Sequence, residues 1–248
     1  MRLIFSRKGF DSSAGKSPSP IVDGVPISLP IPTKHRSETT YREAGLGQLV
    51  EDTTKGRIRA DDLCHEDPVF CRGRWAFGQT GKAQSHLANN GVGVGDVFIF
   101  FGLFASQDGC DRHHRIFGYL RIDEIRRIGP LPGKSDHPTG FVRRHPHTIG
   151  EWNDNNTLYL GAGAKARSAH PSLRLTKDGS LPSIWSVPAW LKEAGLTYHG
   201  NLARWLNQGE LQVAARGQEF VSNVGDQEDP RKWLCALQAA VEGNECEL

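Results

Sequence analysis

The sequence predicts a mixed α/β fold of the α+β kind: one domain over residues 1–248, with a central mixed sheet, short helices and long loops. Three observations support this prediction. The length of 248 residues fits one large domain or two small ones at roughly 100–200 residues each. An apolar run at residues 97–101 and an alternating pattern at 116–122 predict paired strands. Residues 229–241 carry a helix signature, and no repeat or low-complexity linker divides the chain.

The N-terminal half is rich in turns. Residues 3–6 predict a short strand that ends in a polar turn at 7–16. Five prolines at positions 18–32 exclude a helix there and leave short extended pieces. We interpret residues 51–75 as a long polar loop and residues 79–90 as a short helix, which Gly91 ends.

The C-terminal half contains several weak patterns for strands and a helix, and one strong helix pattern. Short strands are expected at 158–160 and 211–214, and Ser186 can cap a helix that runs to Ala194. In the strongest helix, Asp229 would be the N-cap and Pro230 the first helical residue. Its apolar face would consist of Trp233, Leu234, Leu237 and Val241.

Composition excludes several classes of protein. Hydrophobic residues make up 38% and charged residues 23%, which excludes a disordered or fibrous chain. The longest apolar run, 97–105, is far shorter than the roughly 20 residues of a spanning helix, so no membrane segment is expected. A charged start argues against a signal peptide. Five cysteines without a C-x-x-C pair predict free thiols and a cytoplasmic location.

Charge is distributed unevenly along the chain. Residues 110–150 hold eight basic side chains against four acidic ones, whereas residues 217–248, the C-terminal helix and tail, hold two against seven. A basic middle region is compatible with a polyanionic partner that meets one face. The alternative is a solvated loop beside a solvated tail.

Several motifs lack the residue spacing of the phosphate-binding or metal-binding sites that they resemble. Gly9 and Gly15 have five residues between them, whereas the glycines of a phosphate-binding P-loop have four, and the prolines that follow forbid its helix, which excludes an ATPase. The histidines of 113–114 and 145–147 have no established metal-ligand spacing. Residues 65–67 (His-Glu-Asp) could bind a divalent ion, but we favour an ordinary loop. We therefore predict no metal and no cofactor.

The first turn is the best candidate for a ligand site. Cationic donors, a carboxylate and hydroxyls follow the first strand, where open α/β sheets place ligand-binding groups. This set suits a sugar-phosphate ligand, and the alternative is a glycine-rich surface turn. Its members are Arg7, Lys8, Asp11, Ser12, Ser13 and Lys16.

Several longer motifs resemble the nucleotide-modification-associated domain family of the third type. They are FSRKGFDSS (5–13), PSPI (18–21), FGQTGKAQSHL (77–87), GDVFIFFG (95–102) and ARGQEFV (215–221). The resemblance implies a nucleic-acid substrate, in the setting of phage and bacterial systems that make, read or attack modified bases. Lys82 stands where a small residue is expected. The family-typical positions are Arg7, Lys8, Asp11, Ser12, Ser13, His65, Asp67, Gln79, Gln84, His86, Gln218 and Glu219.

Within that setting we predict a DNA glycosylase that excises a bulky, glycosylated base from double-stranded phage DNA, as an antiviral defence. A carboxylate, Asp11 or Asp67, would stabilise the oxocarbenium-like sugar or activate water. Gln79 and Gln84 would read the flipped base. A lysine, Lys8 or Lys16, could instead form a Schiff base. The predicted substrate-binding set is Arg7, Lys8, Ser12, Ser13, Lys16, His65, Gln79, Gln84, His86, Arg143, Arg144, Gln218 and Glu219, in which Arg7, Lys8, Arg143 and Arg144 clamp phosphates.

Three alternatives stay open at this point. A reader module would bind modified bases without cutting, and a metal-dependent nuclease would use the acidic pairs 61–62 and 66–67. An ADP-ribosyl transferase acting on nucleic acid is the third. Trp75 and Trp152 are expected to stack on bases, whereas the other four tryptophans belong to the core. No obligate protein partner is evident.

Overall fold

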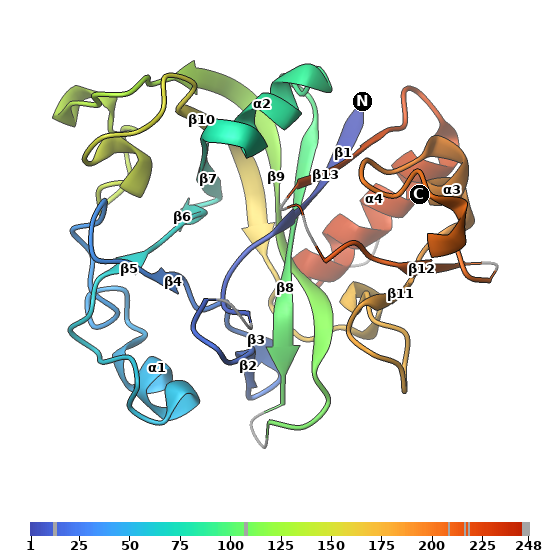
Figure 1. Ribbon diagram of the computed structural model, residues 1–248, viewed down its shortest axis with the longest axis horizontal. Helices are drawn as coiled ribbons and strands as arrows, with labels where there is room; N and C mark the ends of the chain where they lie inside the picture. The colour runs from blue at the N-terminus through green and yellow to red at the C-terminus, as the bar shows by residue number, and fades with distance from the viewer. Residues whose placement is uncertain (12–13, 107–108, 208, 216, 218, 245–248) are drawn as a thin grey trace.

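A nine-stranded mixed sheet forms the centre of the computed structural model (Figure 1), which describes residues 1–248 except 12–13, 107–108, 208, 216, 218 and 245–248. The strand order is β13-β1-β8-β9-β10-β7-β6, and β2 and β3 extend the sheet beside β8. Their bounds are β1 (Arg2–Arg7), β2 (Ser19–Val22), β3 (Val25–Pro26), β6 (Val69–Cys71), β7 (Arg74–Gln79), β8 (Val97–Ala105), β9 (His113–Arg127), β10 (Thr157–Lys165) and β13 (Glu219–Asn223).

The remaining elements are short. Two small strand pairs join β4 (Ile31–Pro32) to β5 (Cys64–His65) and β11 (Ile184–Ser186) to β12 (Glu210–Gln212). The helices are α1 (Gly47–Thr54), α2 (Gly81–Asn89), α3 (Ala189–Ala194) and α4 (Glu228–Glu242), with the 3₁₀ turns η1 (Lys134–Asp136), η2 (Pro146–Thr148), η3 (Pro171–Leu173) and η4 (Leu202–Arg204). Within the described residues, no helix is both long enough and apolar enough to span a bilayer.

The sheet is mixed because β1 pairs in parallel with β8, whereas β13 lies antiparallel on the other edge of β1. The strands β8, β9, β10 and β7 follow as an antiparallel series. A parallel pair needs a long crossover connection, and here the chain between β1 and β8 supplies α1, α2 and the six strands β2 to β7. This long connection also carries half of the site described below.

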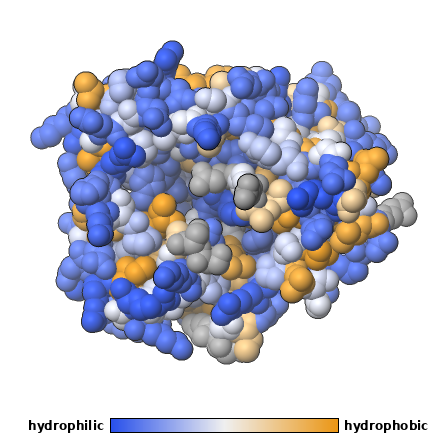
Figure 2. Space-filling model, viewed as in Figure 1, coloured by the Kyte–Doolittle hydropathy of each residue, from blue (hydrophilic) through white to orange (hydrophobic). Residues whose placement is uncertain are grey.

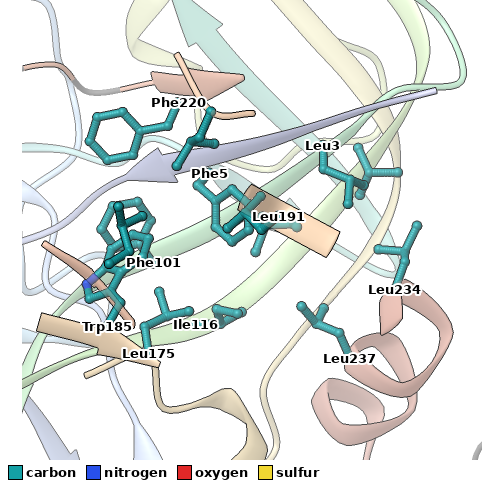
Figure 3. Packing of buried hydrophobic residues seen from close by; sticks show 14 of the residues in the cluster. Leu3, Phe5, Phe101, Ile116, Leu175, Trp185, Leu191, Phe220, Leu234 and Leu237 are labelled. Atoms are coloured by element: carbon teal, nitrogen blue, oxygen red, sulfur yellow. The ribbon is translucent and has the colours of Figure 1, made fainter. Parts of the chain in front are cut away.

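Side chains alternate between two cores along the central strands. Leu3 and Phe5 of β1 join a core with α3 and α4, whereas the intervening Ile4 joins a second core on the opposite face. Figure 3 shows Phe5, Phe101 and Trp185 meeting in the first core, beside Leu234 and Leu237 of α4. In Figure 1, α3 and α4 lie on one side of β8, and α1 lies on the other. The period of two therefore sets which face each strand residue covers.

The sheet curls so that strands distant in its order touch. Gln79, at the end of β7, donates from Nε2 to Oε1 of Glu219 at the start of β13, over 2.8 Å. The ring of Phe77 in β7 packs on Phe98 of β8 at a centroid separation of 4.8 Å. This curvature brings the end of β1, the end of β7 and the start of β13 around one space.

The mixed α/β prediction is confirmed, and so are the strands at residues 3–6, 97–101, 116–122 and 158–160 and the helix at 79–90. The strand at 211–214 is confirmed only in part, as β12 ends at Gln212. The helix at 229–241 is also confirmed, although its N-cap is Gln227 rather than Asp229, and Trp233 is only partly buried.

Three sequence interpretations are wrong. Residues 51–75 are not a continuous loop, since they hold the second half of α1, β5, which pairs with the distant β4, and β6, which forms a hairpin with the start of β7. The helix expected from Ser186 begins at Ala189, because Ser186 pairs with Glu210 in a sheet. Trp75 is fully buried in β7 and stacks on Phe100 at 5.3 Å, so it belongs to the core.

Candidate functional site

A cavity of about 430 Å³ opens where β1, β7 and η2 converge. That volume lies within the roughly 300–1,000 Å³ of typical small-molecule sites. Its side chains are mostly charged or polar and come from segments far apart in the sequence. They are Arg7, Lys8, Asp11, His65, Asp67, Gln79 and His147, with backbone or small side chains at Gly9, Ala14, Gly78, Ala215 and Gly217, and Ile31. Figure 2 shows that hydrophilic residues predominate on the face viewed in Figure 1.

One wall of the cavity is built on a buried ion pair, which we call the lysine wall (Lys8, Gln79 and Glu219). Lys8 Nζ donates to Glu219 Oε1 over 2.9 Å, and the side chains are 11% and 1% exposed. Lys8 Nζ also lies 4.3 Å from the centre of the Phe77 ring, a cation–π distance. Because Gln79 donates to the same Glu219 oxygen, the carboxylate charge is compensated by the protein itself.

Arg7 is fixed by carbonyls and rings. Its two Nη atoms donate to the backbone oxygens of Ala214 and Ala215 over 3.2 Å each. Its guanidinium lies 5.7 Å from the Phe101 ring and 5.9 Å from the Phe220 ring. Burial lowers the pKa of Arg7, and the nearby charge of Asp11 opposes that shift. A cation held this firmly offers a preorganised positive charge beside the cavity.

Asp11 belongs to the turn that follows β1. Its backbone N–H donates to the Ala14 carbonyl over 2.8 Å, and its Oδ1 accepts from the Ala14 N–H over 2.7 Å. These two bonds close a tight local loop, which holds the Asp11 side chain at the cavity. Of the first-turn residues, Arg7, Lys8 and Asp11 share this cavity.

The opposite wall, the histidine wall, consists of His65, Asp67, His145 and His147. Asp67 Oδ1 accepts from the Gly78 N–H over 3.0 Å and lies 3.3 Å from His145 Nε2. Asp67 Oδ2 lies 3.5 Å from His147 Nε2 and 3.7 Å from His65 Nε2. The Asp67 side chain is 5% exposed. One carboxylate thus faces three imidazoles in a nearly dry setting.

Burial acts differently on the two kinds of group in this wall. It lowers the pKa of His147 to about 3, and the Asp67 charge opposes that shift. It also disfavours the charged form of Asp67, but interactions with His145 outweigh it and hold the pKa of the carboxyl well below its usual range. The wall therefore combines a carboxylate with at least one neutral imidazole at neutral pH.

Gly78 is required by the packing of this wall. A Cβ at Gly78 would lie 2.2 Å from two ring atoms of His147, closer than any real contact. The bare backbone lets the imidazole approach β7 while the Gly78 N–H still reaches Asp67. On its other side the His147 ring stacks on Trp152 at 4.0 Å, and Arg36 lies 4.3 Å from that indole. Trp152 thus positions a histidine.

Other predicted site residues lie away from this cavity. Gln84 is buried and accepts from the Tyr159 hydroxyl over 2.9 Å. His86 stacks on Tyr198 at 4.6 Å and lines a neighbouring cavity of about 400 Å³, which shares Gln79 and also contains Glu219. Lys16 is exposed, with a left-handed φ of 55°. Ser12, Ser13 and Gln218 lie outside the described residues.

Four of the eight basic side chains in the middle region form ion pairs with acidic neighbours within the described residues. Arg143 makes a two-pronged ion pair with Glu66, with both N–O distances 2.6 Å, and Arg144 donates to Glu38 over 3.1 Å. Arg121 and Arg126 pair with Asp123 and Glu124. A DNA phosphate would have to displace these carboxylates, so the excess of basic residues between 110 and 150 overstates the free positive charge.

Sequence reasoning missed that His145 and His147 join Asp67, nearly 80 residues away. The His-Pro-His sequence was visible, but it could not be linked to residues 65–67 by spacing alone. Asn156, which binds the His147 ring, gave no signal at all.

Neither a curated protein nor a solved structure matches the chain. The sequence profile of nucleotide modification associated domain 3 matches residues 2–223, which span the whole sheet and both walls of the cavity. The chain therefore belongs to the nucleotide modification associated domain 3 family.

Proposed function

We propose that this protein excises a bulky modified base from DNA by hydrolysing its N-glycosidic bond. The family associates the chain with nucleotide modification. The observation that carries the finer proposal is that Asp11 lines a polar cavity together with Arg7, Lys8 and Gln79. Its volume of about 430 Å³ is compatible with a flipped nucleotide that carries an extra substituent.

In this proposal Asp11 is the catalytic carboxylate. Water attacks C1′ of the deoxyribose while the C1′–N bond breaks, and its electron pair leaves with the base. Asp11 takes the proton of the attacking water, the departing base takes up a proton, and an abasic sugar remains. Asp67 suits this role less well because its oxygens already meet the Gly78 N–H and three imidazoles.

The cations of the lysine wall would bind rather than react. Lys8 Nζ is held by Glu219 and by the Phe77 ring, which favours a positively charged donor over a Schiff-base nucleophile. Arg7 and Lys8 would attract the phosphates that flank the flipped nucleotide. Gln79 would present an amide to the base edge. A host with unmodified DNA would tolerate such an enzyme, which suits defence against phages with modified genomes.

A metal-dependent nuclease is the second candidate, since His65, Asp67 and His147 place three metal-ligand atoms within 4.8 Å of one another. Two imidazoles and a carboxylate are the ligand set of several metal hydrolases. In this reading the phosphodiester, not the glycosidic bond, would be cut.

The test incubates purified protein with phage genomic DNA that carries or lacks hypermodified bases, in EDTA and in parallel with Zn²⁺ or Mn²⁺, and measures abasic sites. We expect abasic sites in modified DNA only, lost in Asp11→Asn and retained in the control Asp178→Asn, whose residue does not line the cavity. Binding without base release would establish a reader instead. Strand cuts without released base, and only with metal, would establish the nuclease.

A further inference from the structure

In the histidine wall, the contact between His147 Nε2 and Asp67 Oδ2, at 3.5 Å, is longer than a charge-assisted hydrogen bond. His147 Nδ1 lies 2.7 Å from Asn156 Oδ1. The Asn156 amide is oriented by its other end, because Nδ2 donates to the carbonyls of Gly129 and His147 over 3.1 and 2.9 Å. Asn156 Oδ1 must therefore accept, and His147 Nδ1 must carry the hydrogen.

This assignment leaves His147 Nε2 as the ring atom that faces Asp67 Oδ2, at 3.5 Å. A cation between the two atoms, either a proton or a metal ion, would remove any repulsion between them in this buried site. A proton would draw the two atoms to the roughly 2.7–2.9 Å of a charge-assisted hydrogen bond. The observed separation is instead close to the ~3.4 Å between two ligand atoms of a tetrahedral site whose bonds are about 2.1 Å.

His145 differs from His147 and supports the carboxylate. Its Nδ1 accepts from the His147 backbone N–H over 3.2 Å, so the ring hydrogen lies on Nε2, which is 3.3 Å from Asp67 Oδ1. This fully buried nitrogen makes no hydrogen bond of good geometry within the described part of the chain, and Asp67 Oδ1 is the charged atom beside it. The Gly78 N–H donates to Asp67 Oδ1 over 3.0 Å and to Oδ2 over 3.3 Å, and Oδ2 also faces His65 and His147.

We propose that His65, Asp67 and His147 bind a divalent first-row transition-metal ion through Nε2, Oδ2 and Nε2. Each ligand atom lies within 4.8 Å of the other two, so modest side-chain movements would close the site. Groups that hydrogen-bond to metal ligands and orient them are typical of such centres. Here Asn156 fixes His147, and His145 fixes Asp67.

The ligand set also indicates which ions fit. Two imidazoles favour Zn²⁺, Fe²⁺, Co²⁺ or Mn²⁺ over Mg²⁺ or Ca²⁺, which prefer all-oxygen sites. Three protein ligands leave coordination positions for water or a substrate oxygen, as in catalytic rather than structural centres. Because all three residues line the cavity that contains Asp11, those positions face the same space. The inference goes beyond the proposed function and does not depend on it.

The test measures metal binding by the protein alone, without DNA. Protein freed of metal with EDTA and dialysed is titrated with Zn²⁺ by calorimetry and with Co²⁺ by visible absorption, in the presence of excess Mg²⁺. We expect one ion per chain. Both His147→Gln and Asp67→Asn should weaken binding by roughly 100-fold, since changes to orienting groups alone cost about 10–100-fold. His35→Gln, at an exposed histidine, should leave affinity unchanged.

Circular dichroism and a melting curve show whether each variant folds. His65 is the more accessible ligand, 17% exposed, so His65→Gln replaces any buried variant that fails to fold. No binding of either ion by wild-type protein would overturn the proposal, as would equal affinity in the folded ligand variants or displacement by Mg²⁺. Metal binding with no base excision would leave the site intact and reject only the glycosylase.

Discussion

The two walls of the cavity each bury a carboxylate, but they balance its charge in different ways. In the lysine wall, Glu219 meets the ammonium of Lys8 at 2.9 Å, so the wall is neutral as folded. In the histidine wall, Asp67 meets imidazoles, and the nearest one with an assigned lone pair, His147, presents it to the carboxylate at 3.5 Å. One wall carries its own cation, and the other is arranged to receive one.

The difference teaches that burial alone does not identify a reactive carboxylate. Both groups are at most 5% exposed. Glu219 is compensated by a residue adjacent in the fold, and its ion pair fixes β13 against β1. Asp67 is oriented by the Gly78 N–H and by His145, and its Oδ2 faces His65 and His147 without an ammonium or guanidinium to balance it among the ion pairs of the described residues. A buried carboxylate that is held in one orientation, but whose negative charge no neighbouring cation balances, is typical of a binding centre.

The largest expected effect comes from breaking the self-compensated wall. Lys8→Met leaves Glu219 charged and buried, which should lower the free energy of unfolding by about 3–5 kcal/mol. The double variant Lys8→Met with Glu219→Gln removes both charges and should recover most of that loss. Chemical denaturation measures each value, with Lys82→Met at an exposed position of α2 as control. A single variant within 1 kcal/mol of wild type would show that Lys8 does not compensate Glu219.

An intermediate effect should follow from disturbing the orientation of Asp67. His145→Leu removes the N–H that faces Asp67 Oδ1 and should weaken Zn²⁺ binding by about 10–100-fold. His145→Gln can place an amide N–H near the same oxygen and should retain most of the affinity. Calorimetric titration of both variants provides the comparison. Equal losses in the two variants would mean that His145 acts through packing rather than through this donor.

The smallest effect separates burial of a histidine from its proximity to a carboxylate. His114 lies in the first core, where Nδ1 accepts from the Trp185 indole N–H over 2.9 Å. Burial lowers the pKa of His114 to about 3, aided by Arg7 and His113 and opposed by Asp11. Because the folded pKa lies below the unfolded value near 6.5, stability from this group is present above pH 6.5. It is lost as pH falls toward 3, by up to about 1.4 kcal/mol per pH unit.

The variant His114→Asn keeps an acceptor for Trp185 and cannot titrate. Between pH 6.5 and 5.5 its free energy of unfolding should fall less than that of wild type, by up to about 1.4 kcal/mol. Denaturation curves at the two pH values measure this difference, and His35→Asn, at an exposed histidine, should show the wild-type dependence. An unchanged slope in His114→Asn would mean that His114 is not held neutral by the fold.

Local sequence patterns were sufficient for the centre of the fold. Alternation in β1 and β9 and the apolar run of β8 predicted strands because side chains of a strand point to opposite faces with a period of two. They failed between residues 51 and 75, where β5 and β6 are only two and three residues long. Such short strands form because partner strands lie beside them in the fold, and no local sequence pattern predicts this pairing. Trp75 was misplaced for the same reason, since polar neighbours in sequence concealed an apolar neighbourhood in space.

By itself, the sequence determined the mixed α/β class, the family and the polar turn after β1, because each of the three depends on patterns within short continuous segments of the chain. Only the tertiary structure decided that Asp67 meets His145 and His147, that Lys8 is neutralised by Glu219, and that Arg143 of the basic middle region is paired with Glu66. These contacts join residues 77 to 211 positions apart. Their electrostatic consequences depend on distance, burial and tautomer, and those quantities exist only once the curled sheet has brought the segments together.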